Sequence, residues 1–172
     1  SDATSNVIAP NGSTNKIGEH FENYIETPTD NASTTAPYYS DPFAAGSSKA
    51  LTVGKGYVIK FADTNAKTVT FTGGSLNTGD VSPSVTRTGT TAAKRGFNLV
   101  GNPYPSYLDW NLVFDAATAT NMRNAIWFRT MGTSAMTFQT YSDGEGVPDD
   151  ASSIIAPMQA FWVKVDKDNT AA

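Results

Sequence analysis

Cysteine and histidine, which often act as nucleophile and general base in enzymes, are nearly absent from this sequence. It has no cysteine and a single histidine, His20, which lies close to Glu19 and Glu22. No Gly-x-Ser-x-Gly segment is present to expose a serine nucleophile, and one histidine cannot build a multi-histidine zinc site. We therefore expect no catalytic residues and interpret His20 as a surface side chain. Glycoside hydrolysis needs two carboxylates about 5–10 Å apart, and the chain has 16 acidic residues, so a small hydrolase stays open as an alternative.

Carboxylates gather in one segment, from Asp143 to Asp150, which also contains two glycines and a proline. Calcium takes six to eight oxygen ligands, and closely spaced carboxylates on a turn can supply several of them. The spacing differs from that of the helix-loop-helix calcium motif, and an ordinary solvated loop is the alternative. The candidate calcium ligands are Asp143, Glu145, Asp149 and Asp150. We expect no other cofactor.

Aromatic residues beside cationic residues are the best candidates for ligand binding. On alternating strand positions Trp127 shares a face with Arg129, and Trp162 shares a face with Lys164. An exposed indole ring could stack on a sugar while the cation bonds the sugar hydroxyls. The alternative is that a second layer of the protein covers these rings. The speculative ligand-binding set is Trp162, Lys164, Trp127, Arg129, Tyr38 and Tyr39.

The charge balance excludes several classes of partner. The chain of 172 residues carries a formal net charge of -4, and its basic residues are scattered. It therefore lacks the cationic surface that holds nucleic-acid phosphates. No apolar run approaches the roughly 20 residues of a membrane span, so we expect no membrane insertion.

Period-two patterning dominates the chain and indicates strands. In the segment from Ala125 to Met131, Ile126 and Phe128 face one way and Trp127 and Arg129 the other. The sequence predicts a weak helix of one or two turns that starts at Trp110 and is capped by Asp109. The other expected strands cover residues 56–61, 67–72, 96–100, 135–141 and 160–165, with a further candidate at 20–26 and a long loop from 27 to 48.

Short strands with frequent turn signals predict an all-β fold, an antiparallel β-sandwich with long loops and at most one short helix. We favour a jelly-roll-like over an immunoglobulin-like sandwich, because the Cys-Trp-Cys pattern of immunoglobulin domains is absent. We expect residues 1–172 to form a single domain, excised from a longer surface protein, with residues 1–6 as a flexible leader.

Three blocks of unusual composition follow one another along the chain. The first is Gly54-Lys55-Gly56-Tyr57. The second is Gly96-Phe97-Asn98-Leu99-Val100-Gly101-Asn102-Pro103-Tyr104-Pro105. The third is Ile155-Ala156-Pro157-Met158-Gln159-Ala160-Phe161-Trp162-Val163. Glycine, asparagine and proline in the second block predict a rigid corner between strands, and either of its X–Pro bonds is a candidate for the cis form.

In this order the blocks resemble a segment that recurs in large exported surface proteins of the Bacteroidetes type, many of which carry a type IX secretion sorting tail. The resemblance spans residues 51–165. It implies an exported β-module within a longer polypeptide, located outside the cell or on the bacterial surface. It carries no catalytic residues with it.

Three hypotheses about function follow. The first is a non-catalytic module of a secreted or cell-surface protein with a structural or adhesive role. The second is a carbohydrate-binding module that uses exposed aromatic rings, and the third is a small hydrolase. The partners implied by the first two are a glycan or another surface protein.

Overall fold

The computed structural model describes residues 4–6, 20–23, 48–60, 70–72, 74–87, 95–115, 118–119, 121–131, 136–148 and 151–166. Within these residues the fold is all-β, with antiparallel sheets and one four-residue helix, as the patterning predicts. The sandwich topology stays a prediction. Among the candidate site residues, Tyr38, Tyr39, Asp149 and Asp150 lie outside the described residues.

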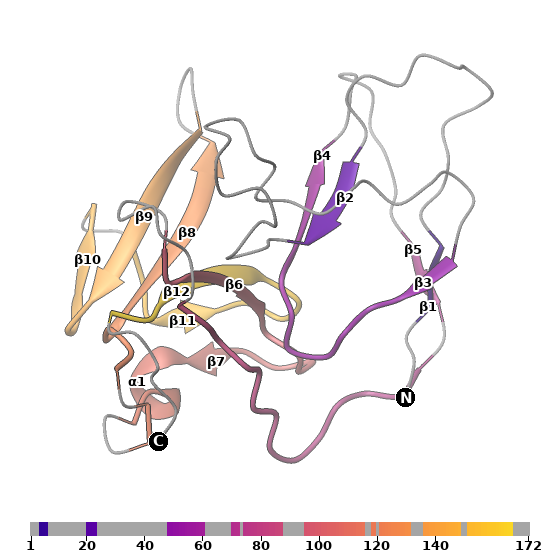
Figure 1. The fold of residues 1–172 in the computed structure, drawn as a ribbon, viewed down its shortest axis with the longest axis horizontal. Helices are drawn as coiled ribbons and strands as arrows, with labels where there is room; N and C mark the ends of the chain where they lie inside the picture. Colours follow the sequence, from indigo (N-terminus) through magenta and orange to yellow (C-terminus); the bar gives the residue numbers. More distant parts are fainter. Residues whose placement is uncertain are drawn as a thin grey trace.

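The largest element is a five-stranded antiparallel sheet with the order β10-β9-β8-β12-β6 (Figure 1). Four of its strands follow the predicted segments to within one or two residues, because their alternating residues suit a pleated surface with a buried side. The short strand β10 carries no such pattern and was not predicted. The bounds are β6 Phe97–Gly101, β8 Ala125–Met131, β9 Met136–Ser142, β10 Glu145–Val147 and β12 Ala160–Lys164.

Three smaller sheets accompany it. Strands β3 (Ser48–Ala50), β1 (Thr4–Asn6) and β5 (Thr70–Thr72) form one, in that order. Strands β2 (His20–Asn23) and β4 (Tyr57–Lys60) form the second. Strands β7 (Leu108–Asp109) and β11 (Ile154–Ile155) form the third. Residues Thr4–Asn6, expected in a flexible leader, are thus paired on both sides.

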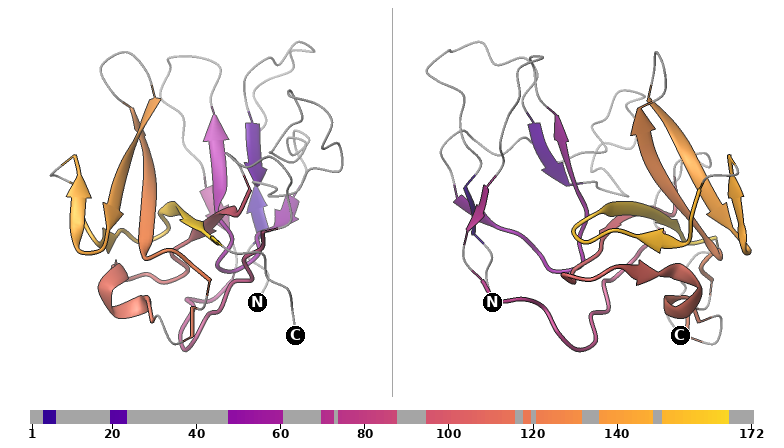
Figure 2. Two further views of the ribbon diagram at one scale, coloured as in Figure 1. Left: turned by 60° about the vertical axis from the view of Figure 1, so that its left-hand side comes forward. Right: turned by 180° about the vertical axis from the view of Figure 1, so that it is seen from behind.

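One face of the five-stranded sheet, the core face, carries the hydrophobic core. Ile126 is fully buried and Val163 nearly so, and residues of β7, β11 and helix α1 pack against them. Figure 2 shows β7 and α1 lying together at one end of the sheet. Burying one such side chain stabilises the fold by about 1.5–3 kcal/mol. The core cluster is Val100, Trp110, Ile126, Phe128, Tyr141, Ile155, Phe161 and Val163.

Helix α1 (Trp110–Val113) begins where the sequence predicts. The side chain of Asp109 accepts a hydrogen bond from Asn111 N–H at 3.1 Å and caps the first turn. The indole of Trp110 is buried, and its Nε1–H donates to Asn124 Oδ1 at 2.9 Å. The helix is only one turn long. A helix this short is stabilised by the tertiary packing of Trp110 rather than by helix propensity.

Candidate functional site

The first two motif blocks lie side by side at the end of the five-stranded sheet. Gly56 N–H donates to Leu99 O, and Gly101 N–H donates to Gly54 O, both at 3.0 Å. Residue 56 must be glycine here, because a Cβ would lie 2.6 Å from the Leu99 Cγ and 2.7 Å from the Val100 carbonyl oxygen. The turn at Gly54–Gly56 therefore extends the sheet by a short bridge beyond β6.

Asn102 joins the second block to the third. It is 4% exposed and is the buried polar residue of the described core. Its Nδ2 group donates to Ser106 O at 2.8 Å, Ala156 O at 3.0 Å and Ile155 O at 3.2 Å. Its Oδ1 atom accepts from Tyr104 N–H at 3.0 Å. A single amide thus ties the corner after β6 to the chain between β11 and β12.

Gln159 completes this connection from the third block. Its carbonyl oxygen accepts from Asn102 N–H, and its side-chain Oε1 accepts from Ala156 N–H, each at 3.0 Å. Both X–Pro bonds of the corner are trans, contrary to the expectation of a cis form there; the cis bond of the described chain is Val147–Pro148. Hydrogen bonds from Asn102 and Gln159, not a cis proline, shape the corner.

The corner also holds the segment that precedes β6. The Tyr104 hydroxyl donates to Gly79 O at 2.7 Å and accepts from Val81 N–H at 3.1 Å. Asn77 Nδ2 donates to Pro103 O at 2.8 Å. The spacing of glycine, asparagine and proline predicted a rigid corner, but not that its side chains would bind residues more than twenty positions away.

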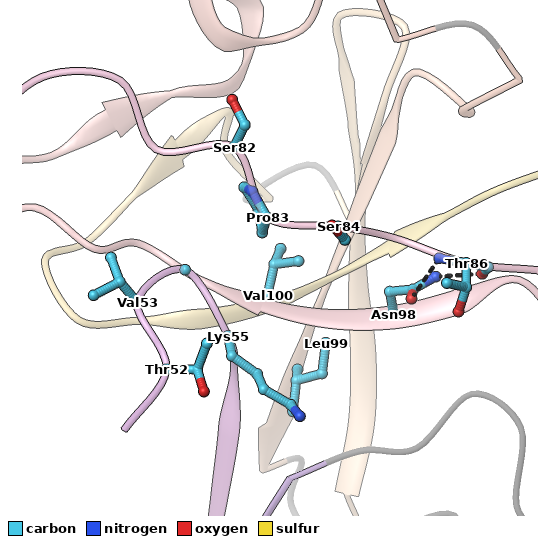
Figure 3. A pocket seen from close by; sticks show the side chains of 11 residues that line it. Thr52, Val53, Lys55, Ser82, Pro83, Ser84, Thr86, Asn98, Leu99 and Val100 are labelled. Carbon is cyan, nitrogen blue, oxygen red and sulfur yellow. Dashed lines mark hydrogen bonds between the residues drawn. The ribbon is translucent and has the colours of Figure 1, made fainter. Parts of the chain in front are cut away.

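Asn98, inside the second block, fixes residues 81–87 over the core face. Its Oδ1 accepts from Thr86 N–H at 3.0 Å, and its Nδ2 donates to Thr86 O at 2.9 Å. The carboxamide thereby makes the two hydrogen bonds to Thr86 that the backbone of a neighbouring strand would otherwise make (Figure 3). No sequence signal distinguished this asparagine from a solvent-facing one.

Two pockets flank the junction of the motifs. One, of about 450 Å³, lies between residues 52–55, residues 82–86 and β6 (Figure 3). The other, of about 240 Å³, has Gly101 and Ala160 among its lining residues, with Tyr57 and Met158. Lys55 lines both. Among the described residues that line them it is the one charged side chain, so these pockets offer a cation rather than an acid–base pair.

The two tryptophans of the predicted binding set are neighbours on β8 and β12, which the pairing of these strands decides and the sequence did not predict. Trp162 pairs with Trp127 in register, on the side of the sheet that we call the tryptophan face. Trp162 is 8% exposed, so its ring offers little area for stacking. Trp127 is half-buried and meets Phe97 edge-on at 5.4 Å between ring centroids.

The two cations of the set differ. Lys164 Nζ lies 4.7 Å from the centre of the Phe97 ring, a cation–π contact. Arg129 is exposed and pairs in register with Phe138, which is 52% exposed. Phe138 was not in the predicted set, because the pairing of β8 with β9 places it opposite Arg129 and the sequence does not give that register.

The candidate calcium ligands are placed only in part. Asp143 and Glu145 are exposed at the turn between β9 and β10, and the Asp143 carboxylate accepts from the Ser142 hydroxyl at 3.1 Å. Within the described ranges, no three His, Cys, Asp or Glu side chains gather closely enough to hold a metal ion. His20 lies in β2, paired with Lys60.

In the part of the chain that the structure describes, no helix is long and apolar enough to cross a membrane. Comparison with curated proteins gave no match, and neither did comparison with solved structures. A protein-family model described as a domain of unknown function, DUF8693, matches residues 3–172. This match covers nearly the whole chain and includes all three motif blocks, so the chain belongs to the DUF8693 family.

Proposed function

We propose that the chain is a non-catalytic module of an exported or cell-surface protein, with a structural or adhesive role. The observation that carries this proposal is the use of the Asn102 amide. All of its described hydrogen bonds go to the protein's own backbone, at the point where the second and third motif blocks meet. The most distinctive residues of the sequence therefore act in assembling the fold.

The chemistry of the two pockets supports the same proposal. Acid–base catalysis needs a group that takes a proton and, usually, a second that gives one. Lys55 is the sole charged group among their described lining residues, and it is exposed. A cation alone can attract an anionic partner, which fits binding better than turnover.

Labelling of intact cells tests the location. An antibody raised against the module, applied to the source bacterium with and without permeabilisation, is expected to label unpermeabilised cells. A cytoplasmic protein labelled in the same cells serves as the control for intactness. Labelling that requires permeabilisation would contradict the proposed surface location.

A second candidate function, carbohydrate binding, is favoured by the neighbouring pair Arg129 and Phe138. An exposed ring beside an exposed guanidinium on one sheet face offers stacking together with hydrogen bonding to hydroxyls. The half-buried Trp127 lies two residues along the same strand and face. The proposed sugar-binding surface therefore consists of Arg129, Phe138 and Trp127 and does not include the buried Trp162.

A glycan array tests this second candidate. We expect binding by the wild-type module to fall at least about tenfold in Phe138→Ala, the loss expected when one stacking contact worth about 1.4 kcal/mol is removed. Leu112→Ala, which truncates an 85% exposed side chain on α1, is the matched control. The candidate is wrong if no glycan binds, or if both variants bind like wild type.

A further inference from the structure

The outer edge of β6, the edge that faces away from β12, is only partly paired. Leu99 O and Gly101 N–H point to this edge, since they bond Gly56 and Gly54. The N–H and C=O groups of one residue in a strand point to the same edge, and every second residue does likewise. Leu99 N–H and Phe97 C=O therefore also point outward. Among the described residues, neither group has a hydrogen-bond partner.

Among the segments that the structure describes, none runs alongside this edge to pair with all of it. After Gly56 the chain enters β4, which pairs with β2 and runs away from β6 (Figure 1). On the other side, Thr86 bonds the Asn98 side chain and so stands one side chain away from β6. The 450 Å³ pocket lies between residues 52–55 and residues 82–86, and Asn98, Leu99 and Val100 are part of its lining. Its volume falls within the range of about 300–1,000 Å³ typical of ligand sites.

The lining of the pocket suits an extended peptide. Backbone groups along a strand edge supply hydrogen bonds, and small hydroxyl and apolar side chains lie beside them, among them Thr52, Val53, Pro83 and Ser84. Figure 3 shows Lys55 extending along the same side of β6 as Leu99. Its ammonium group has no ion-pair partner among the described residues. The pocket thus combines an unpaired strand edge with one positive charge.

We propose that the outer edge of β6 binds an extended peptide segment by strand addition, with a carboxylate of that segment beside Lys55. The peptide carbonyl opposite Leu99 accepts from its N–H, and a peptide N–H donates to the Phe97 carbonyl. Charge complementarity with Lys55 selects an acidic residue or a chain terminus at that position. The geometry of the edge alone supports this proposal, so it does not depend on the proposed surface location.

Amide hydrogen exchange in the free protein tests whether the edge is open. Leu99 and Val100 are neighbours in the same strand, but Val100 points toward β12, where it pairs with Phe161. We expect the Leu99 amide to exchange at least about tenfold faster than the Val100 amide. Equal protection of the two amides would show that the edge is already paired and would overturn the proposal.

A second experiment tests the peptide and its charge. Random peptides of about ten residues, near the upper length of ordinary strands, are displayed on phage and selected on the wild-type module. We expect the selected peptides to be acidic and to slow exchange of the Leu99 amide. Selected peptides that leave this amide unchanged, or a failure to enrich any peptide, would overturn strand addition.

Substitutions at Lys55 then separate charge from shape. Binding of a selected peptide is expected to fall about fivefold in Lys55→Gln, in line with a partly exposed ion pair of about 1 kcal/mol, and to change less than about twofold in Lys55→Arg. Leu112→Glu changes the net charge by the same amount on the remote helix α1 and is expected to bind like wild type. Loss of binding in Leu112→Glu equal to that in Lys55→Gln would reduce the effect to overall charge, against a carboxylate contact at Lys55.

Discussion

At the scale of single residues, asparagine and glycine determine how the motif blocks meet. The amide of Asn102 donates to the carbonyl oxygens of Ser106, Ile155 and Ala156. The amide of Asn98 bonds the backbone of Thr86 as a neighbouring strand would. Gly56 lets the backbone of one block lie directly against Leu99 in the other. Asn102 and Gly56 make these contacts where they are buried, and a substitution at a buried contact has the largest effect.

Replacing Asn102 with alanine removes the amide, so three backbone carbonyl oxygens lose a donor and the Tyr104 N–H loses an acceptor. Each unsatisfied buried polar group costs about 1–3 kcal/mol, so we expect Asn102→Ala to lower the free energy of unfolding by about 3 kcal/mol. Urea denaturation followed by tryptophan fluorescence measures it. Asn111→Ala is the matched control, because Asn111 is exposed and, among the described residues, its side chain bonds the Tyr141 hydroxyl alone. An equal loss in both variants would contradict the role of Asn102.

A methyl group at position 56 would collide with the backbone of β6. We expect Gly56→Ala to destabilise the fold by about 2–3 kcal/mol, as overpacking in a well-packed site does. Gly101→Ala, whose Cβ would lie 3.1 Å from the Lys55 carbonyl oxygen, is a milder version of the same contact. Thermal unfolding of the two variants should therefore give a lower Tm for Gly56→Ala. The reverse order would show that the two blocks do not approach as closely as described.

At the scale of elements, the main strands lie where side-chain alternation predicts them, and the short helix begins directly after its predicted cap. Strands β8, β9 and β12 lie where alternation predicts them, and the core-facing residues of β8 and β12 are the predicted ones. The two-residue strands β7 and β11 were not predicted, because two residues carry no period. Their pairing arises from the chain on either side of them, which the Asn102 amide and the Trp110 indole hold in place.

The helix cap allows a test of α1 on its own. Asp109→Ala removes the oxygen that accepts from Asn111 N–H, and we expect the free energy of unfolding to fall by about 1 kcal/mol. Asp109→Asn keeps an acceptor at the same position and is expected to stay within about 0.5 kcal/mol of wild type. Chemical denaturation at neutral pH distinguishes them. If asparagine costs as much as alanine, the cap does not stabilise the helix.

At the scale of the whole molecule, the motif blocks bring together parts of the chain that are far apart in sequence. Residues 54–56, 77–87, 96–105 and 155–160 meet around one end of the five-stranded sheet. The pockets that flank this junction, and the open edge of β6, exist only because these segments converge. Any partner that binds there contacts several segments of the folded chain rather than one motif.

The module as a whole is expected not to depend on calcium for stability. Asp143 and Glu145 are exposed, and Asp143 already accepts from Ser142. A ligand at about 100 times its Kd would stabilise the fold by about 2.7 kcal/mol, and we expect no such gain. Thermal unfolding in millimolar calcium and in excess chelator should give the same Tm to within about 1 °C. A higher Tm in calcium that disappears in Asp143→Asn would instead support the metal site.

The sequence by itself determined the fold class, the main strands and the core-facing residues of β8 and β12, because side-chain alternation is a local property of a pleated strand. It also determined the start of α1, since a cap and its helix are neighbours in the chain. Only the tertiary structure decided that Trp162 is buried while Phe138 is exposed, and that the side chains of Asn98 and Asn102 bond the backbone of distant segments. These outcomes depend on which strands lie next to each other. A contact between distant segments produces no periodic pattern in the sequence of either segment, so the sequence alone does not predict it.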